Sequence, residues 1–247
     1  MQIKELHNWP TNPQDAEIIQ NQFCDFVIKE SCFDKLDLLT AVDTAYDSDL
    51  NVLYAAAVTM KYPELTEIEK VLARADITCP YVPSLLAFRE GPVILKVLSR
   101  LKTTPDMVMF AGHGRAHPLS FGMASHLGLL LNMPSIGCAR KSLGGQYDLP
   151  GNESGQYNIL TVSNIECGYV YRSRTGVNPI YISPGHKCNL EDSLKIVINC
   201  LEKYRIPQPL RLAHLYANKF RRASIRKQLT NNNIANNSNQ KRETLSR

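Results

Sequence analysis

The sequence lacks several features that would place it outside ordinary globular proteins. No apolar run approaches the roughly 18 residues of a membrane span, and the N-terminus has neither the basic start nor the apolar stretch of a signal peptide. The seven cysteines include no C-x-x-C pair, which argues against a disulfide framework and a zinc ribbon. We therefore expect a cytoplasmic protein without a membrane partner, whose cysteines are reduced thiols buried mostly in the core.

What the sequence does contain is a globular composition with its positive charge concentrated at one end. Hydrophobic residues make up 44% and charged residues 21% of the 247 residues, as in proteins with a buried core. Residues 219–247 carry eight Lys or Arg residues against Glu243 alone, whereas residues 1–218 have a net charge of −2. We predict one domain over 1–218 and a basic, Asn-rich tail over 219–247, largely disordered. The tail either contacts phosphates or keeps the protein soluble.

The hydrophobic pattern predicts strands and helices that alternate within a single α/β domain. Strands are expected over 36–42, 52–60, 67–73, 107–111, 135–139, 157–161, 167–172 and 179–182. Helices are expected over 15–33, 86–101, 121–131 and 189–204, with Ser120 as the N-cap of the third. Ala124 and Gly128 lie one turn apart, so they leave a flat stripe for close packing on a sheet.

Polar residues that could carry chemistry lie where predicted strands end. Asp43 follows an apolar strand, Glu90 lies in the stretch from Pro80 to Pro92, and a third stretch runs from Phe110 to Pro118. A carboxylate beside an apolar strand is costly unless it is hydrogen-bonded, paired or bound to a metal. Taken singly, however, Asp43 could be a turn residue and Glu90 a charge that the helix dipole stabilises.

Together with the motifs Phe121–Gly128, Pro134–Ala139, Gly168–Arg174, Ser183–His186 and Arg211–His214, these stretches resemble the Endonuclease V family over about residues 5–220. The resemblance implies a ribonuclease H-like fold, in which helices flank a central five-stranded mixed sheet. It also implies a Mg²⁺-dependent enzyme (Mn²⁺ may substitute) that recognises deoxyinosine in DNA by base flipping. Such an enzyme hydrolyses the second phosphodiester bond 3′ to the lesion, and we expect it to act as a monomer.

The resemblance also assigns roles to individual residues. Asp43 and Glu90 match metal ligands, His214 matches a water-positioning or proton-transfer residue, and Arg140 stands where a catalytic lysine is usual. The segment Pro80, Tyr81, Val82 and Pro83 matches a wedge that fills the gap left by a flipped base. Ser84, Leu86, Gly112 and Leu143 match the lesion pocket, and His117 and Lys141 match possible phosphate contacts. His113, His126 and His186 are expected to have structural roles.

One family feature is missing, because Ala111 stands where the family has a third metal-binding Asp. Asp106 lies five residues upstream, about 16 Å along an extended strand, and cannot replace it. Two hypotheses follow: cleavage is weakened but survives with a single ion or with Mn²⁺, or the protein binds inosine-containing DNA without cutting it. An inosine-containing RNA is a third possible target, since some relatives act on RNA.

Overall fold

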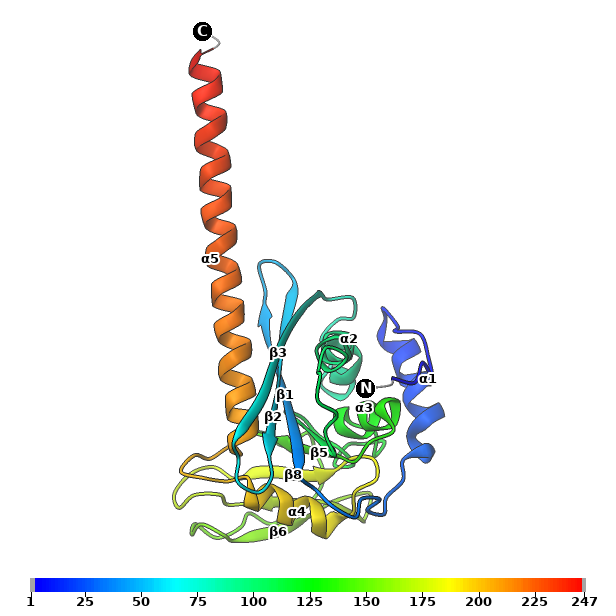
Figure 1. Cartoon of the computed structure of the whole chain (residues 1–247). Coiled ribbons are helices and arrows are strands. Elements are labelled where there is room, and N and C mark those ends of the chain that lie inside the picture. Colours follow the sequence, from blue (N-terminus) through cyan, green and yellow to red (C-terminus); the bar gives the residue numbers. More distant parts are fainter. Residues whose placement is uncertain (1–2, 246–247) are drawn as a thin grey trace.

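The computed structural model describes residues 3–245, with side chains described for residues 3–228 and for Thr230. A single sheet of eight strands in the order β3-β2-β1-β4-β5-β8-β7-β6 forms the body of the molecule (Figure 1). The strands are β1 (Leu38–Asp47), β2 (Val52–Lys61), β3 (Glu67–Asp76), β4 (Met107–Phe110), β5 (Ser135–Ala139), β6 (Tyr157–Val162), β7 (Ile165–Tyr171) and β8 (Ile180–Pro184).

The expected five-stranded sheet is present, but it is part of a larger one. Strands β3-β2-β1-β4-β5 form a mixed sheet, because β1 pairs antiparallel with β2 and parallel with β4. The sheet does not end at β5, since β8 pairs with it antiparallel and is followed by β7 and β6. The strand count of five is therefore corrected to eight. The mixed α/β class, with helices flanking a central sheet, is confirmed.

Helices cover both faces of the sheet. On one side lie α1 (Pro13–Phe23), α2 (Leu86–Leu98) and α3 (Met123–Leu131), and on the other α4 (Leu190–Asn199) and α5 (Gln208–Leu245) (Figure 1). Short 3-10 turns occupy Cys24–Phe26 and Pro83–Leu85. Because both faces are covered, β4 and β5 are buried along their whole length. Their continuous apolar runs are typical of such strands.

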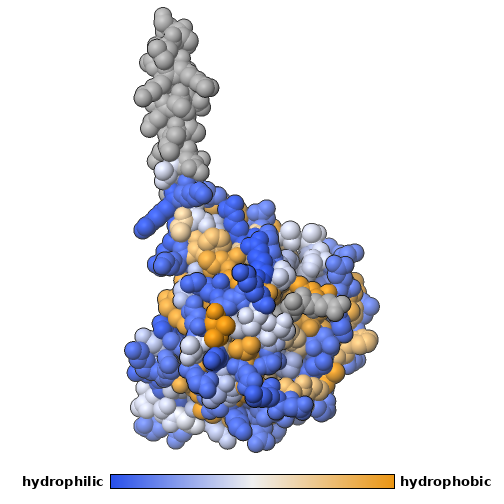
Figure 2. Space-filling model, in the orientation of Figure 1, coloured by the Kyte–Doolittle hydropathy of each residue, from blue (hydrophilic) through white to orange (hydrophobic). Residues whose placement is uncertain are grey.

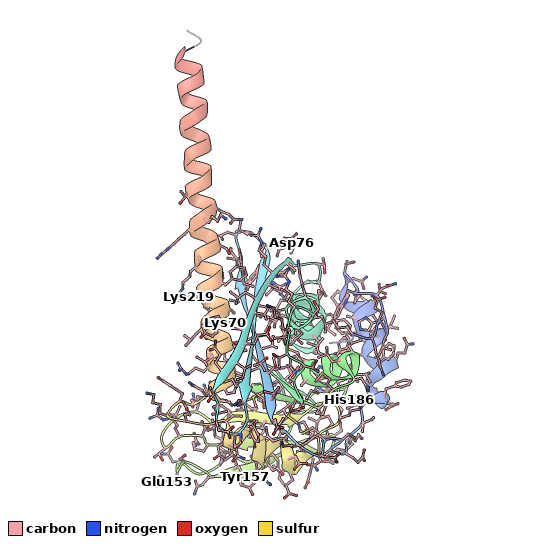
Figure 3. All side chains as sticks on the ribbon, in the orientation of Figure 1. Lys70, Asp76, Glu153, Tyr157, His186 and Lys219 are labelled. Atoms are coloured by element: carbon pink, nitrogen blue, oxygen red, sulfur yellow. The ribbon has the colours of Figure 1, made fainter. Side chains whose placement is uncertain are left out.

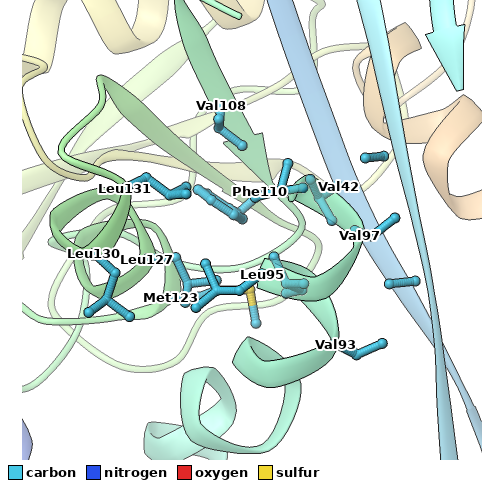
Figure 4. Close-up of a cluster of buried hydrophobic side chains, with 14 of the residues drawn as sticks. Val42, Val93, Leu95, Val97, Val108, Phe110, Met123, Leu127, Leu130 and Leu131 are labelled. Atoms are coloured by element: carbon cyan, nitrogen blue, oxygen red, sulfur yellow. The ribbon is translucent and has the colours of Figure 1, made fainter. Parts of the chain in front are cut away.

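The larger of the two main cores lies between the sheet and helices α2 and α3. In Figure 4, Phe110 and Val108 of β4 meet Leu127 and Leu131 of α3. Close approach of α3 depends on Gly128, because a Cβ there would overlap the Ser135 hydroxyl on β5. The predicted flat stripe is therefore a real packing surface. The second core lies between the sheet and α4 with the start of α5.

Several predicted boundaries differ from the structure. The first helix ends at Phe23 and its 3-10 extension at Phe26, and the fourth helix ends at Asn199 rather than residue 204. Gly122 is the N-cap of α3, whereas Ser120 has a φ of 50° and lies outside the helix. Strand β1 continues to Asp47, so Asp43 lies inside a strand and not at its end.

Helix α5 was not predicted, and it crosses the expected boundary at residue 218. Phe220 contacts Tyr54 edge-to-face with ring centroids 5.3 Å apart, and Arg221 donates a hydrogen bond to the Tyr46 carbonyl. These contacts hold the first part of the basic segment on the sheet, so disorder does not begin at residue 219. The side chains of Leu229 and of residues 231–247 lie outside the described part.

Two expectations about composition can be compared with the described residues. Searched over this part of the chain, no helix is both long and apolar enough to cross a membrane. All seven cysteines are free thiols, and Cys79, Cys138, Cys167, Cys188 and Cys200 are buried. The prediction that most of the cysteines lie in the core is confirmed.

Candidate active site

A cleft of about 590 Å³ gathers most of the predicted site residues. Strand β1, the loop after β4, the start of α2, the segment after β5 and helix α5 all contribute to its walls. The predicted residues that line it are Asp43, Tyr81, Pro83, Leu86, Glu90, Ala111, Gly112, Arg140, Lys141, Leu143 and His214. Residues from five separate stretches of sequence therefore meet in one place.

Asp43 and His214 form the central contact of the cleft. His214 Nδ1 lies 2.9 Å from Asp43 Oδ2, with the carboxylate side chain 15% exposed and the imidazole 37% exposed. The other carboxylate oxygen, Oδ1, accepts a hydrogen bond from the Thr44 backbone N–H. With a neutral imidazole, Nδ1–H donates to Asp43, so Nε2 carries the lone pair of the ring. Asn218, one turn further along α5, places its side-chain amide 3.3 Å from Nε2.

Glu90 lies in the second turn of α2 and shares the cleft with Asp43. Burial, followed by the nearby negative charge of Asp43, raises the pKa of Glu90 to about 7. Two carboxylates in one partly buried cleft repel each other unless a proton or a cation lies between them. The pair therefore has the electrostatic character of a cation site.

Ala111 lies directly beside this acidic pair. The parallel register pairs Val42 with Phe110, and the Ala111 N–H donates to the Val42 carbonyl, so Ala111 is the neighbour of Asp43. Asp106 cannot substitute, because its carboxylate accepts hydrogen bonds from the Asp37 and Leu38 backbones at the other end of β1. Within the described residues, no group of three or more His, Cys, Asp or Glu side chains could hold a metal ion.

The predicted wedge projects from a firmly held loop. Tyr81 is 64% exposed at the rim of the cleft, while its neighbours Cys79 and Val82 pack into a small core with Leu85 and Phe88. Pro83 begins the 3-10 turn that leads into α2. The ring is thus presented to solvent by a segment with little freedom to move.

The lesion pocket is only partly as predicted. Leu86, Gly112 and Leu143 line the cleft, but Ser84 does not. The Ser84 carbonyl instead accepts hydrogen bonds from His117 Nε2 at 2.7 Å and from Gln20 at 2.9 Å. These bonds fix the loop between the wedge and α2.

His117 was predicted as a possible phosphate contact, but the structure gives it a different environment. Its side chain is buried, with 2% exposure, and its second nitrogen, Nδ1, accepts a hydrogen bond from the Leu119 N–H. Both ring nitrogens are thus used within the protein, and burial lowers the pKa of His117. A neutral, doubly bonded imidazole is suited to holding the Ser84 loop and not to binding phosphate.

The cations of the cleft come from the segment that follows β5. Arg140 and Lys141 are exposed and line the cleft, which supports their predicted position. Their backbones are held, since the Arg140 carbonyl accepts from Arg205 and the Lys141 carbonyl from His113. The predicted structural roles of the other histidines agree with this placement: His126 contacts His7, and His186 accepts a hydrogen bond from the Ile28 N–H.

Two residues of the site were missed from the sequence. Asn218 contacts His214 on the same helix face, a spacing of four residues that could have revealed it had α5 been predicted. Arg89 lies between two tyrosine rings, with its guanidinium carbon 4.8 Å from the ring centroid of Tyr46 and 6.0 Å from that of Tyr81. No sequence spacing indicates that contact, because β1 supplies Tyr46 and a loop supplies Tyr81.

The fold and the cleft together define a class of protein. Acidic side chains from a central strand and a flanking helix meet a histidine, with cations at the rim, on a mixed sheet flanked by helices. This arrangement can bind a phosphodiester, neutralise its charge and move a proton at an attacking water. Such an arrangement is typical of a nuclease active site.

Comparisons with known proteins identify the family. A family model described as Endonuclease V matches residues 21–215. The Endonuclease V of Dehalococcoides mccartyi is 39% identical over 217 residues, which cover 88% of this chain and 97% of that protein. That of Methanothrix thermoacetophila is 39% identical over 219 residues, 89% of this chain and 96% of the relative. The chain belongs to the Endonuclease V family.

Solved structures agree with this assignment. The Endonuclease V of Streptomyces avermitilis superimposes with a TM-score of 0.83 at 32% identity, covering 91% of this chain and 100% of that one. The Ciona intestinalis enzyme, solved with DNA containing an inosine followed by a ribo-adenosine, gives a TM-score of 0.73 at 26% identity, covering 83% and 95%. The protein is accordingly a DNA repair endonuclease, a hydrolase of phosphodiester bonds.

Proposed function

We propose that this endonuclease recognises deoxyinosine in DNA, extrudes the base and hydrolyses the second phosphodiester bond 3′ to it. The observation that carries the proposal is the single cleft whose lining includes Tyr81, Glu90 and the hydrogen-bonded pair of Asp43 and His214. The Ciona relative with inosine-containing DNA supports the substrate class. We further propose that the protein acts as a monomer in the cytoplasm.

The acidic pair fits a hard divalent cation, Mg²⁺ or Mn²⁺. Its donors are carboxylate oxygens, and a bound cation would offset the two effects that raise the pKa of Glu90, its burial and the neighbouring charge of Asp43. Asp43 and Glu90 would hold the ion, which when bound supplies an activated water and neutralises charge on the leaving 3′ oxygen. Ala111 offers only a methyl group beside this pair, so we propose that metal binding and cleavage are weaker than in relatives that have Asp there.

His214 is proposed to handle the proton. Asp43 fixes the ring orientation through Nδ1, and the Asn218 amide lies beside Nε2. Nε2 can therefore accept a proton from a water in the cleft or hold that water in line with the phosphorus. Arg140 and Lys141 are proposed to contact the phosphates next to the cleaved bond.

Base recognition is proposed to use the pocket around Leu86, Gly112 and Leu143, with Ser84 acting through its fixed backbone. Hypoxanthine differs from adenine by an oxygen at position 6 and a proton on N1. A pocket that donates to O6 and accepts from N1–H leaves two buried groups unpaired when adenine enters, and rejects it strongly. Tyr81 would fill the gap in the base stack.

A labelled inosine duplex and a matched adenine duplex test the proposal, each incubated with Mg²⁺ or Mn²⁺. We expect a nick one nucleotide beyond the lesion in the inosine duplex only, and none with Asp43→Asn. Cleavage of both duplexes, or full activity in Asp43→Asn, would refute it.

The second candidate function, favoured by Ala111, is binding of inosine-containing nucleic acid without cleavage. In that case selective binding persists without product, and Ala111→Asp creates the nick. Competition between matched inosine-containing DNA and RNA then identifies the preferred nucleic acid.

A further inference from the structure

A band of exposed cations and aromatic rings leads from the cleft onto helix α5. It begins at Arg89, which lies against the rings of Tyr81 and Tyr46, and Tyr46 is itself 43% exposed. The carbonyl of Tyr46 accepts a hydrogen bond from Arg221 on α5. Rings alternating with guanidinium groups are typical of surfaces that follow a nucleic-acid strand.

On α5 the band continues as a basic stripe, defined as Lys219, Arg222 and Arg226. All three side chains are exposed, and their spacing of three and four residues places them on one helix face. Successive residues turn by about 100°, so this face is rotated by about 120° from the one that carries His214 and Arg221. Figure 3 labels Lys219 on the part of α5 that lies alongside the sheet.

The stripe is uncompensated and firmly positioned. No acidic residue occurs from Gln208 to Gln228 in the sequence. Contacts of Phe220 with Tyr54 and of Arg221 with Tyr46 fix the helix directly beside it. Where α5 leaves the body of the molecule, the described surface in Figure 2 is mainly hydrophilic. The match of the family model ends at residue 215, before the stripe begins.

We infer that the basic stripe of α5 binds the phosphate backbone of the duplex arm flanking the cleft, with Arg89 and Tyr46 joining the two sites. The inference goes beyond the proposed function in that it requires duplex DNA but neither inosine recognition nor cleavage. Arg226 lies 12 residues after His214, about 18 Å along the helix. At about 3.4 Å per base pair, the stripe engages only a duplex arm longer than roughly five base pairs.

The test compares Lys219→Gln/Arg222→Gln/Arg226→Gln with the parent protein on duplexes whose arms are shorter or longer than this limit. The matched control, Lys35→Gln/Lys61→Gln/Lys102→Gln, removes the same charge from exposed positions at the opposite end of β1. All six side chains are exposed, so we expect each variant to fold. Binding is measured by fluorescence anisotropy across a range of salt concentrations, on inosine-containing and undamaged duplexes.

We expect the parent and the control to bind long arms more tightly than short arms, and the stripe variant to lose that gain. Three lost phosphate contacts would reduce the salt slope by about 2.7, so that between 50 and 200 mM salt the parent's affinity falls about 40-fold further than the variant's. An unchanged length dependence and salt slope in the stripe variant would overturn the inference. So would an equal loss in the control, or a gain with arm length seen on RNA and absent on duplex DNA.

Failure of the proposed function gives a different result. If the protein does not distinguish inosine from adenine but the stripe variant alone loses the arm-length gain, the proposed substrate is wrong and the stripe still binds DNA. If inosine selectivity is present and the stripe variant behaves like the control, only the inference about α5 is wrong.

Discussion

Replacing Ala111 by Asp should convert the acidic pair into a three-carboxylate site with a large and measurable dependence on Mg²⁺. Position 111 follows the pair Val42–Phe110 in the parallel register of β1 and β4, so the new carboxylate would start about 4.8 Å from the Asp43 backbone. Two unit charges about 5 Å apart repel by about 3 kcal/mol at an effective dielectric constant of 20. Without metal, Ala111→Asp should therefore unfold more readily than the parent.

Bound Mg²⁺ should remove that repulsion and gain an additional oxygen ligand. We expect the Mg²⁺-dependent increase in the free energy of unfolding to be about 3 kcal/mol larger in Ala111→Asp than in the parent, which corresponds to roughly a hundredfold lower Kd for the ion. For a chain of this size, that difference shifts the melting temperature by about 6–12 °C. Thermal unfolding in Mg²⁺ and in EDTA measures it, and nicking of an inosine duplex should rise in parallel.

Ala111→Asn is the matched control, because it adds a side chain of the same size without the charge. If Ala111→Asn and Ala111→Asp gain equally from Mg²⁺, the gain comes from an added oxygen ligand and not from the charge of the carboxylate, and the electrostatic reasoning is wrong. Equal Mg²⁺ stabilisation of the parent and Ala111→Asp would show that the ion does not bind beside Asp43. This second result would remove the basis for a metal at this site.

Three further outcomes are expected. Tyr81→Ala should weaken binding to an inosine duplex roughly 10- to 100-fold, which is the contribution of one stacked aromatic ring. The melting temperature should stay unchanged, because the ring is mostly exposed. A lowered melting temperature would show that Tyr81 has a structural role instead. Burial lowers the pKa of His113 and of His186 to about 4, so their stabilising effect is complete above pH 6.5 and is lost as the pH falls through 4. Each histidine should lower the free energy of unfolding by about 2 kcal/mol between pH 6.5 and pH 5. The urea midpoint measures this loss in the Glu90→Gln background, because protonation of Glu90 would change the stability in the opposite direction. A urea midpoint that stays constant from pH 7 to pH 5 would contradict this prediction. Gly128→Ala should destabilise the protein by about 1–3 kcal/mol, because the added methyl overlaps the Ser135 hydroxyl, and an unchanged urea midpoint would mean that α3 can shift away from β5.

Much of the fold could be read from hydrophobic patterning alone. Short apolar runs such as Met107–Phe110 identify buried strands because both of their faces are covered, and β2 and β3 begin at the residues expected. Patterning does not say which strands pair, so it could not place β8 beside β5 in the same sheet. Helix α5 was missed because its apolar residues are few and its basic residues suggested a tail.

The site was predicted mainly through motifs, and its errors have physical causes. The motifs identified Asp43, Glu90 and His214. They did not show that Asp43 lies inside β1, because the strand continues past its apolar run to Asp47. The burial of His117 depends on the Ser84 carbonyl turning toward it, which no local pattern reveals. Arg89 and Asn218 act through contacts made only after the loop, the strand and α5 come together.

Helix α5 carries both His214 of the cleft and the basic stripe, so the two are joined by one continuous helix. Between His214 and the end of the stripe at Arg226, Phe220 packs on Tyr54 and anchors the helix on the sheet. A displacement of the C-terminal end of α5 would be resisted at the contact of Phe220 with Tyr54 before it could reach the hydrogen bond between His214 and Asp43. Substitutions beyond Phe220 can therefore accumulate at little cost to the chemistry, and a changed reach along DNA need not disturb the hydrolytic centre.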